Sequence, residues 1–404
     1  MTAKRVFWAL VISSGAILAV TIGIRQSLGL FVSPLNTSTG LGIVTVSFAL
    51  AVGQFAWGAA QPVFGILADR MGSFRVIALG ALLLALGLAV TPFMHTDIGL
   101  VVFLGVVAAA GAGAGSFSIL IGATAQRLPA DRRAFASGFI NAGGSFGQFI
   151  FAPLSQALIS TIGWIGALWA LAASALLTIP LALPFRESKS GAAARVAVQA
   201  AGMGIGEQAR IAFRDRSYWL LHAGFFTCGF HIAFLVTHLP GEVDLCGLPA
   251  SVSAASLAII GLANIVGSIG AGWLGQTQRM KMILVWMYGS RALAVALYLM
   301  APKTPITFYV FAFVLGLTWL ATVPPTAGLV GKLFGTRHLA TLFGLTLLTH
   351  QIGGFFGAWL GGIAIASTGN YNWMWYADIA LAGIAAVLNL PIREAHPRVA
   401  AAAA

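Results

Sequence analysis

The stretch Gly65-Ile66-Leu67-Ala68-Asp69-Arg70-Met71-Gly72 joins two apolar runs that cover residues 44–67 and 74–94. Each run is long enough for a helix that crosses the roughly 30 Å hydrocarbon core of a bilayer. The adjacent acid and base within the connection belong outside that core, where a charged side chain is expensive. The stretch therefore predicts a hairpin of two membrane-spanning helices.

The composition extends this pattern to the whole chain. Apolar residues make up 59% of the 404 residues, and Asp, Glu, Lys and Arg make up only 8%, whereas a soluble domain is roughly 25% charged. This excludes a set of soluble domains, and the long runs without alternation exclude the strands of a membrane barrel. We predict an all-α membrane protein with twelve transmembrane helices, at residues 7–34, 44–67, 74–94, 98–125, 134–160, 164–185, 217–240, 250–275, 281–301, 306–331, 339–366 and 373–392.

The formal net charge of +12 indicates orientation. If Met1 is cytoplasmic, all but three of the 22 lysine and arginine residues fall on the cytoplasmic side. The exceptions are Lys303 in an outer loop, and Arg25 and Arg291 within helices. Because this is the positive-inside pattern, we expect a multi-pass protein of the cell inner membrane with both termini in the cytoplasm. Nucleic acid is excluded as a partner, since its binding needs basic residues gathered on one face.

The remaining composition argues against a secreted protein or an enzyme. The first apolar run is too long for the core of a cleavable signal, so we expect it to stay as the first helix. Cys228 within a helix and Cys246 in an outer loop are poorly placed for a disulfide. The sequence contains no G-x-x-x-x-G-K-[ST] loop, no H-E-x-x-H and no zinc-like Cys/His spacing. We therefore expect no enzyme activity, no cofactor, no metal site and no ATP-driven transport.

A weak internal repeat divides the chain into two halves. Residues 23–34, GIRQSLGLFVSP, align with residues 229–240, GFHIAFLVTHLP, at an offset of 206. The same offset relates three pairs of glycines: Gly122 and Gly328, Gly138 and Gly344, Gly147 and Gly353. We predict an N-terminal six-helix bundle at 1–185, a cytoplasmic linker at 186–216 and a C-terminal six-helix bundle at 217–404. Parallel repeats of this kind place a binding site between the halves, near the bilayer midplane, with alternating access.

The opening stretch also resembles the G-x-L-A-D-R-x-G signature of the major facilitator superfamily, in the loop between the second and third helices. Within that superfamily, GIRQSLGLF (23–31) and TWLATVPPT (318–326) resemble bacterial relatives of monocarboxylate and oxalate/formate carriers. The chain departs at Ser73 and Phe74, where members usually have basic residues, and at Ser268, where such carriers commonly place a substrate arginine. The resemblance implies two pseudo-symmetric six-helix bundles and a functional monomer.

The resemblance further implies a gating role for the loop. It acts in the family as a latch on the cytoplasmic side, and the alternative is a fixed helix cap that never rearranges. The positive end of the helix that begins after Arg337 is expected to face Asp69. The predicted gating residues are Gly65, Asp69, Arg70, Gly72 and Arg75.

Arg25 is the most informative candidate for substrate binding. It lies well inside the first helix, where an arginine costs at least about 2.5–3.5 kcal/mol unless it faces a wet cavity or a partner. No acid lies at that depth among the first six helices. A guanidinium group suits a carboxylate, so we expect Arg25 to bind an anionic substrate. The alternative is an arginine that reaches toward the membrane surface or bonds to helix-end carbonyls.

Other polar residues within predicted helices extend the candidate site. His231 is the repeat mate of Arg25 and could share the substrate or carry a coupling proton, and His350 and Gln351 lie midway along the eleventh helix. Arg291 would be a second anion-binding residue if it faces the cavity between the halves. The alternative is that it forms hydrogen bonds to backbone carbonyls. For each of these residues, helix packing is the competing interpretation. The remaining candidates are the buried amides Asn141 and Asn264 and a cavity wall at Trp319.

These features favour a secondary transporter that moves a small organic anion, expected to be a monocarboxylate, by proton symport or anion exchange. Protons and the lipid bilayer are the other expected partners. A proton-coupled drug or metabolite efflux carrier of the same superfamily is one alternative, although the first six helices lack an intramembrane acid. A non-transporting membrane receptor is the alternative from another class.

Overall fold

The computed structural model describes residues 3–125, 127–128, 130–186, 205–334 and 339–394, apart from a few side chains within helices. The described part of the chain is helical throughout and forms no strand. The first half, residues 3–186, consists of the helices α1 Ala3–Ser27, η1 Leu28–Phe31, α2 Val32–Thr39, α3 Ile43–Met71, α4 Ser73–Val90, η2 Thr91–Phe93, α5 Asp97–Leu100, η3 Val101–Ala108, α6 Ala109–Ala114, α7 Phe117–Ala125, α8 Ala130–Leu176, α9 Thr178–Leu181 and η4 Leu183–Phe185.

The second half, residues 205–394, begins with a short helix that precedes the long ones. Its helices are α11 Ile205–Phe213, α12 Arg216–Leu245, α13 Ala250–Thr277, α14 Met280–Met300, α15 Pro305–Thr318, α16 Val323–Phe334, α17 Leu339–Thr368 and α18 Asn372–Asn389.

Local chemistry explains where several of these helices begin and end. Gly72 joins α3 to α4 with φ +86°, a conformation open to glycine and strained for other residues. Gly163 takes φ +74° inside α8 and separates its two helical parts. The side chain of Asp215 accepts a hydrogen bond from the backbone N–H of Ser217, which caps the first turn of α12.

Nine segments of the described residues are long and apolar enough to cross a membrane. One of them, Gly138–Leu181, contains both helical parts that meet at Gly163. Helices α17 and α18 are not among the nine, although they have 30 and 18 residues. The all-helical membrane fold is thus confirmed, and the number of twelve spans stays a prediction.

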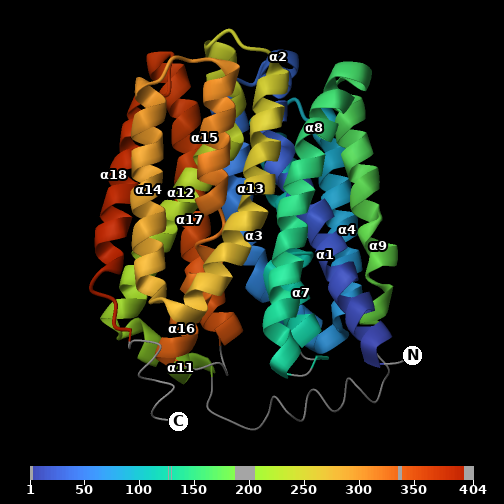
Figure 1. Ribbon diagram of the computed structural model, residues 1–404. Coiled ribbons are helices and arrows are strands. Elements are labelled where there is room, and N and C mark those ends of the chain that lie inside the picture. The colour runs from blue at the N-terminus through green and yellow to red at the C-terminus, as the bar shows by residue number, and fades with distance from the viewer. Residues whose placement is uncertain (1–2, 126, 129, 187–204, 335–338, 395–404) are drawn as a thin grey trace.

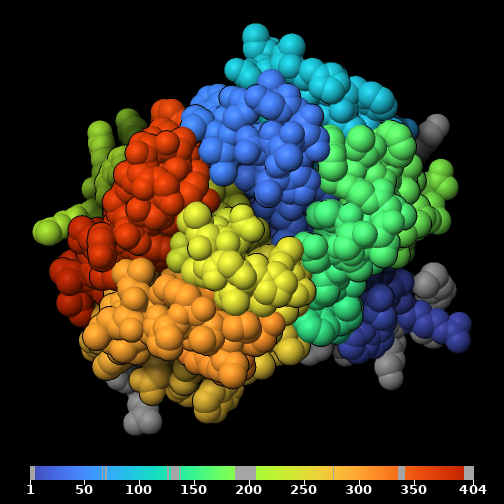
Figure 2. Space-filling model, turned by 90° about the horizontal axis from the view of Figure 1, so that it is seen from above, coloured from blue at the N-terminus to red at the C-terminus, as the bar shows by residue number. Residues whose placement is uncertain are grey.

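The two halves stand side by side, with the first half in blue to green and the second in yellow to red (Figure 1). The first and last described residues, Ala3 and Glu394, lie at one end of the bundle, which we call the terminal end, and α2 lies at the opposite end, which we call the far end. Within the halves, α1 packs on α8 and α12 packs on α17. Between the halves, α3 packs on α17 and α8 packs on α13. From above the far end, the blue surface of the first half adjoins the red and yellow surfaces of the second (Figure 2).

Glycines related by the sequence repeat make equivalent contacts in the two halves. A Cβ atom added to Gly147 of α8 would overlap the carbonyl of Ala19 on α1, and one added to Gly353 of α17 would overlap the carbonyl of Phe226 on α12. These glycines let the backbones of paired helices approach closely. The offset of 206 therefore corresponds to the same helix contact in each half.

The outer surface of the bundle is apolar, as a lipid-facing surface requires. Met300, Trp286 and Ile306 are exposed over 85%, 74% and 72% of their surface. Large apolar side chains would not be left in water on this scale by a soluble protein. The buried polar residues lie instead between the helices, and several of them meet where the halves face each other.

Candidate functional site

Arg25 lies where the two halves meet, near the end of α1. Its Nη2 donates hydrogen bonds to the Oε1 of Gln54 on α3 and, at 3.2 Å, to the Oε1 of Gln351 on α17. The guanidinium carbon lies 4.4 Å from the centre of the Trp57 ring, which is a cation–π contact. Arg25 therefore joins residues of both halves and is held by neutral groups alone.

No carboxylate lies within ion-pair distance of Arg25 in the described part of the chain. The ion pairs found there involve His231, Lys332 and Arg393. A half-buried arginine beside two amides and an aromatic ring keeps its full positive charge without a counter-ion. Such a group is suited to bind an anion that arrives from outside the protein.

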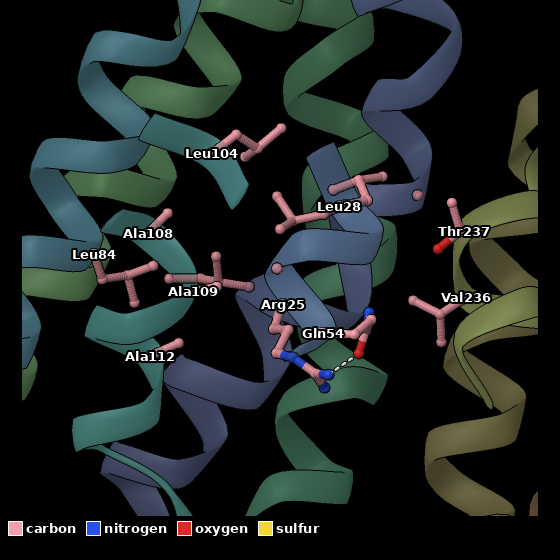
Figure 3. A pocket seen from close by; sticks show the side chains of 14 residues that line it. Arg25, Leu28, Gln54, Leu84, Leu104, Ala108, Ala109, Ala112, Val236 and Thr237 are labelled. Atoms are coloured by element: carbon pink, nitrogen blue, oxygen red, sulfur yellow. Dashed lines mark hydrogen bonds between the residues drawn. The ribbon is translucent and has the colours of Figure 1, made fainter. Parts of the chain in front are cut away.

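A small cavity adjoins Arg25 and is otherwise almost wholly apolar (Figure 3). Its volume open to the centres of water molecules is about 30 Å³, which holds only one or two waters. Of the described residues that line it, Arg25 is the only charged one, and Gln54 and Thr237 are the polar ones. The other lining residues are Ile24, Leu28, Gly29, Leu50, Gly53, Leu84, Leu104, Ala108, Ala109, Ala112 and Val236.

The wall of this cavity includes a segment of unusual helix geometry. Leu104 and Ala108 belong to η3, which is a π-helix over Val101–Ala108, and Ala109 follows it in α6. Such segments are rare and occur frequently at functional sites. The sequence analysis did not identify these residues, because a run of Val, Ala, Leu and Gly carries no signal that separates a π-helix from an ordinary membrane helix.

The halves are in close contact on the far-end side of Arg25. A Cβ atom added to Gly29 would overlap the carbonyl oxygen of Val236 on α12, and one added to Gly362 on α17 would overlap the side chain of Ser47 on α3. Phe48 also packs edge-on against Trp359, with ring centres 5.7 Å apart. These contacts bring the two halves together on the far-end side of the cavity.

Toward the terminal end, α3 and α17 leave more room between them. A Cβ atom added to Gly58 of α3 would lie 2.5 Å from the Cγ of Gln351, but one added to Gly65, farther along α3, would meet no heavy atom within 4 Å. Gly344 on α17 likewise has no neighbour within 4 Å of an added Cβ. The close contact between α3 and α17 thus lies on the far-end side of Gly65 and Gly344.

The buried amides on the other contact between the halves bond across it. Asn264 of α13 donates from its Nδ2 to the hydroxyl of Ser145 on α8 at 2.8 Å, and its Oδ1 accepts from the backbone N–H of Leu320 at 2.9 Å. Gln148 of α8 donates to the carbonyl of Leu257 on α13 at 3.1 Å. Asn141 is buried on α8, and its Oδ1 has no hydrogen-bond partner among the described residues.

His231 lies outside the cavity wall and has a partner that the sequence analysis did not assign to it. Its Nδ1 lies 2.5 Å from the Oδ2 of Asp378 on α18, and both side chains are fully buried. His231 therefore forms an ion pair or a short hydrogen bond within the second half. His231 is not among the residues that line the cavity beside Arg25.

Arg291 is buried and bonds to backbone carbonyls, which was the alternative to a role in the cavity. Its Nη2 donates to the carbonyl oxygens of Thr318, at 2.7 Å, and Trp319, at 3.2 Å. Helix α15 ends at Thr318 and α16 begins at Val323, so the break exposes carbonyls that a continuous helix would satisfy. Pro324 and Pro325 contribute to the break because they lack an N–H donor. Trp319 is fully buried at this break and does not line the cavity.

His350 and Gln351 follow each other on α17, and only Gln351 contacts Arg25. The Nε2 of Gln351 lies 2.9 Å from the Nδ1 of His350, so the two side chains are joined. His350 is buried against the Phe225 ring, with ring centres 4.7 Å apart. Gln54 of α3 is the other amide that accepts a hydrogen bond from Arg25.

The predicted gating loop is only partly described. The side chains of Asp69 and Arg70 lie outside the described residues, as does the start of the facing helix at Arg337, so their latch stays a prediction. Gly65 lies within α3, and Gly72 makes the turn into α4. Arg75 is exposed in the first turn of α4. Among the described residues, no group of three His, Cys, Asp or Glu could hold a metal ion.

Comparison with known proteins agrees with this geometry. Residues 11–358 match the family described as Major Facilitator Superfamily. The chain is 27% identical over 398 residues to monocarboxylate transporter 13 of Rattus norvegicus, and the alignment covers 95% of this chain and 89% of the relative. It is 24% identical over 376 residues to the oxalate:formate antiporter of Oxalobacter formigenes, with 91% and 86% covered. The crystal structure of a D-xylose-proton symporter superposes with a TM-score of 0.71 at 15% identity over 98% of both chains, which shows a shared fold.

Proposed function

Because this chain belongs to the Major Facilitator Superfamily, we propose that it is a secondary transporter that moves a small organic anion by alternating access between its two halves. Its relatives carry the names of monocarboxylate transporters and of an oxalate:formate antiporter. Two similar halves that face each other across a polar site are the architecture in which rocking exposes that site to each side in turn.

The observation that carries the proposal is the pairing of Arg25 with neutral groups from both halves. Gln54 and Gln351 accept its hydrogen bonds, and no carboxylate partner for it lies in the described part of the chain. A carboxylate that enters the cavity would gain two parallel charge-assisted bonds from the guanidinium group. Binding at this point would act on the relative position of the halves, since Arg25 bonds to both.

The lining of the cavity favours a monocarboxylate. Arg25 is the one charged residue among the lining residues, so one negative charge can be neutralised there. The apolar side chains of Leu28, Leu50 and Leu104 suit a short hydrocarbon tail. The cavity of about 30 Å³ is smaller than such a substrate, so substrate entry requires the halves to separate. Among the proposed gating residues, Asp69 and Arg70 would control that separation at the terminal end.

Orientation and coupling complete the proposal. The distribution of lysine and arginine supports an inner-membrane protein with both termini in the cytoplasm, which makes the far end the outer side. The protein acts as a monomer, and it couples anion movement either to a proton or to a second anion in exchange.

Uptake into proteoliposomes that contain only this protein tests the function. Vesicles preloaded with an unlabelled carboxylate should take up the labelled form of that same carboxylate. A panel of short monocarboxylates, dicarboxylates and organic cations identifies the substrate class, and Arg25→Gln should abolish the uptake. Lys303→Gln is the matched control, because it removes one positive charge in the loop between α14 and α15 and should leave uptake unchanged.

The same panel separates the alternatives. Movement of organic cations or neutral drugs, driven outward by a proton gradient, would establish an efflux carrier instead. Binding of a ligand without flux in the same vesicles would establish a receptor. Normal carboxylate uptake by Arg25→Gln would refute the role of Arg25 while leaving a transporter in place.

A further inference from the structure

A buried contact between a histidine and a carboxylate joins α12 and α18 in the second half. The Nδ1 of His231 and the Oδ2 of Asp378 are 2.5 Å apart, and both side chains have no exposed surface. Burying a carboxylate is costly unless it is paired and hydrogen-bonded. The pair lies outside the wall of the Arg25 cavity, and neither substrate binding nor the helix break at Trp319 requires an acid at this place.

Several polar atoms around this pair lack a hydrogen-bond partner. In the described part of the chain, they include the Nε2 of His231, the Oδ1 of Asp378, the Nε and Nη1 of Arg291, and the Nε2 of His350. Buried polar atoms in native proteins are almost always paired with protein or with ordered water. Four ionisable residues with free polar atoms therefore mark a region that can take up water and protons.

Direct contacts lead from the cavity toward this region. Arg25 donates to Gln351 at 3.2 Å, and the Nε2 of Gln351 lies 2.9 Å from the Nδ1 of His350. Arg291 donates to the carbonyl of Trp319 at 3.2 Å, and the Trp319 ring packs against His231. The charge of Arg291 also reaches His350. A series of charged and titratable groups thus runs from Arg25 through His350 and Arg291 to the pair.

The other titratable groups that face this series are few. Tyr288 on α14 and Cys228 on α12 interact with each other, and Tyr288 also interacts with Arg291. Trp319 packs edge-on against His231, with ring centres 5.7 Å apart, and contributes no charge. The charged and titratable groups on which the inference depends are therefore His231, Asp378, Arg291 and His350.

We propose that the His231–Asp378 pair binds the coupling proton of this transporter, and that Arg291 and His350 link its charge to the anion at Arg25. A proton from water on one side of the membrane forms an N–H bond at the free Nε2 of His231. The imidazolium is stabilised by the Asp378 carboxylate until the proton leaves to water on the other side. This inference rests on the proposed function, since it concerns how anion transport is driven.

Charge balance explains why the proton and the anion would travel together. With neutral His231, the charges of Arg291 and Asp378 cancel, and Arg25 is left with one positive charge. A proton on His231 adds a second positive charge in a medium of low dielectric constant, where like charges repel strongly. A carboxylate at Arg25 removes that repulsion. Anion binding therefore favours protonation, and by linkage protonation favours anion binding to the same extent.

Two assays on wild type, Asp378→Asn and His231→Gln test this inference. Exchange of labelled for unlabelled carboxylate without a pH gradient requires binding and rocking alone. Accumulation driven by an inward proton gradient requires coupling as well. We expect wild type to perform both, and each variant to keep exchange while its accumulation falls to the level seen without a gradient.

A matched control and a direct proton measurement sharpen the test. Glu242 is also a buried acid on α12, and it accepts a 2.8 Å hydrogen bond from Tyr298 rather than from a histidine. Glu242→Gln should therefore keep gradient-driven accumulation. A pH dye sealed inside the vesicles should report proton entry when the carboxylate is added to wild type, and no such entry with Asp378→Asn.

Each remaining outcome has one interpretation. If wild type exchanges no carboxylate, the proposed function fails. If wild type exchanges but is not driven by a proton gradient, or if the variants still accumulate substrate, this inference is overturned and the proposed function stands. Loss of exchange together with accumulation, or failure of both Asp378→Asn and Asp378→Glu to fold, would make the pair structural and would also overturn the inference.

Discussion

Arg25 of α1 donates a 3.2 Å hydrogen bond to Gln351 of α17, so the one charged residue of the cavity is bound to both halves of the protein. On the proposed function, a substrate that binds Arg25 would compete with a contact that also positions the halves. Occupation of the site would then be linked to the conformational change that alternating access requires.

Replacing Arg25 with lysine tests whether the shape of the guanidinium group matters beyond its charge. Lysine keeps the positive charge but offers a point donor, which cannot form two parallel bonds with a carboxylate. Loss of one charge-assisted bond, about 1.5–3 kcal/mol, corresponds to an affinity weaker by about 10- to 150-fold. The concentration dependence of exchange should therefore rank wild type first, then Arg25→Lys, then Arg25→Gln. Equal affinity of wild type and Arg25→Lys would contradict the predicted bidentate contact.

Gly29→Val tests whether the far end closes by contact of Gly29 with α12. A side chain at this position would overlap the backbone of Val236, so we expect the variant to stay open on the outer side and to transport poorly. In a Cys246→Ser background, Thr237→Cys should react with an impermeant maleimide faster in the Gly29→Val protein. Gly383→Val is the control, since an added Cβ there meets nothing within 4 Å. Unchanged labelling and uptake with Gly29→Val would exclude this contact as the outer closure.

Gly147→Ala and Gly353→Ala test the repeat. Each added methyl group would overlap a backbone carbonyl of the paired helix, and overpacking of this kind costs about 1–3 kcal/mol. Both variants should therefore unfold at a lower temperature in detergent. Gly122→Ala is the control, because it has free space around the added Cβ and should gain about 0.5–1 kcal/mol from helix propensity. If only one of these two variants unfolded at a lower temperature, the contacts of Gly147 and Gly353 would not be equivalent.

The pH dependence of Cys246 labelling tests the orientation of the second half. Cys246 follows α12 at the far end, while Cys228 is fully buried. Burial raises the pKa of the Cys246 thiol, the nearby Glu242 raises it further, and Lys303 lowers it. Because only the thiolate reacts, an impermeant maleimide added outside should label slowly at neutral pH and faster as the pH rises through that raised pKa.

Two substitutions test how the charges of Glu242 and Lys303 shift the pKa of Cys246. Glu242→Gln should lower the pKa of Cys246 and speed labelling at pH 8, and Lys303→Met should raise the pKa and slow it. Labelling from the cytoplasmic side alone would reverse the proposed orientation. A rate that does not depend on pH would show that access, rather than ionisation, limits the reaction.

The repeat and the hairpin stretch show how far the sequence could predict the fold. Apolar runs separated by charged turns fix helices across a bilayer because the hydrocarbon core permits little else. The equivalent roles of Gly147 and Gly353 follow from their spacing, since helices that approach closely need small residues at the contact. The predicted boundary between 160 and 164 also coincides with the bend at Gly163, whose φ of +74° separates the two helical parts of α8.

The membrane-spanning character and the pattern of helices were determined by the sequence alone, which also marked Arg25 as a cation without an acid nearby in the sequence, since each depends on the local balance between charge and hydrocarbon. Only the tertiary structure decided which polar groups meet. Arg25 and Gln351 are 326 positions apart, and His231 and Asp378 are 147 apart. Their contacts depend on the rotation of each helix about its own axis, and packing against distant helices sets that rotation. When a membrane helix is apolar on most sides, its sequence does not show which face will meet its neighbours.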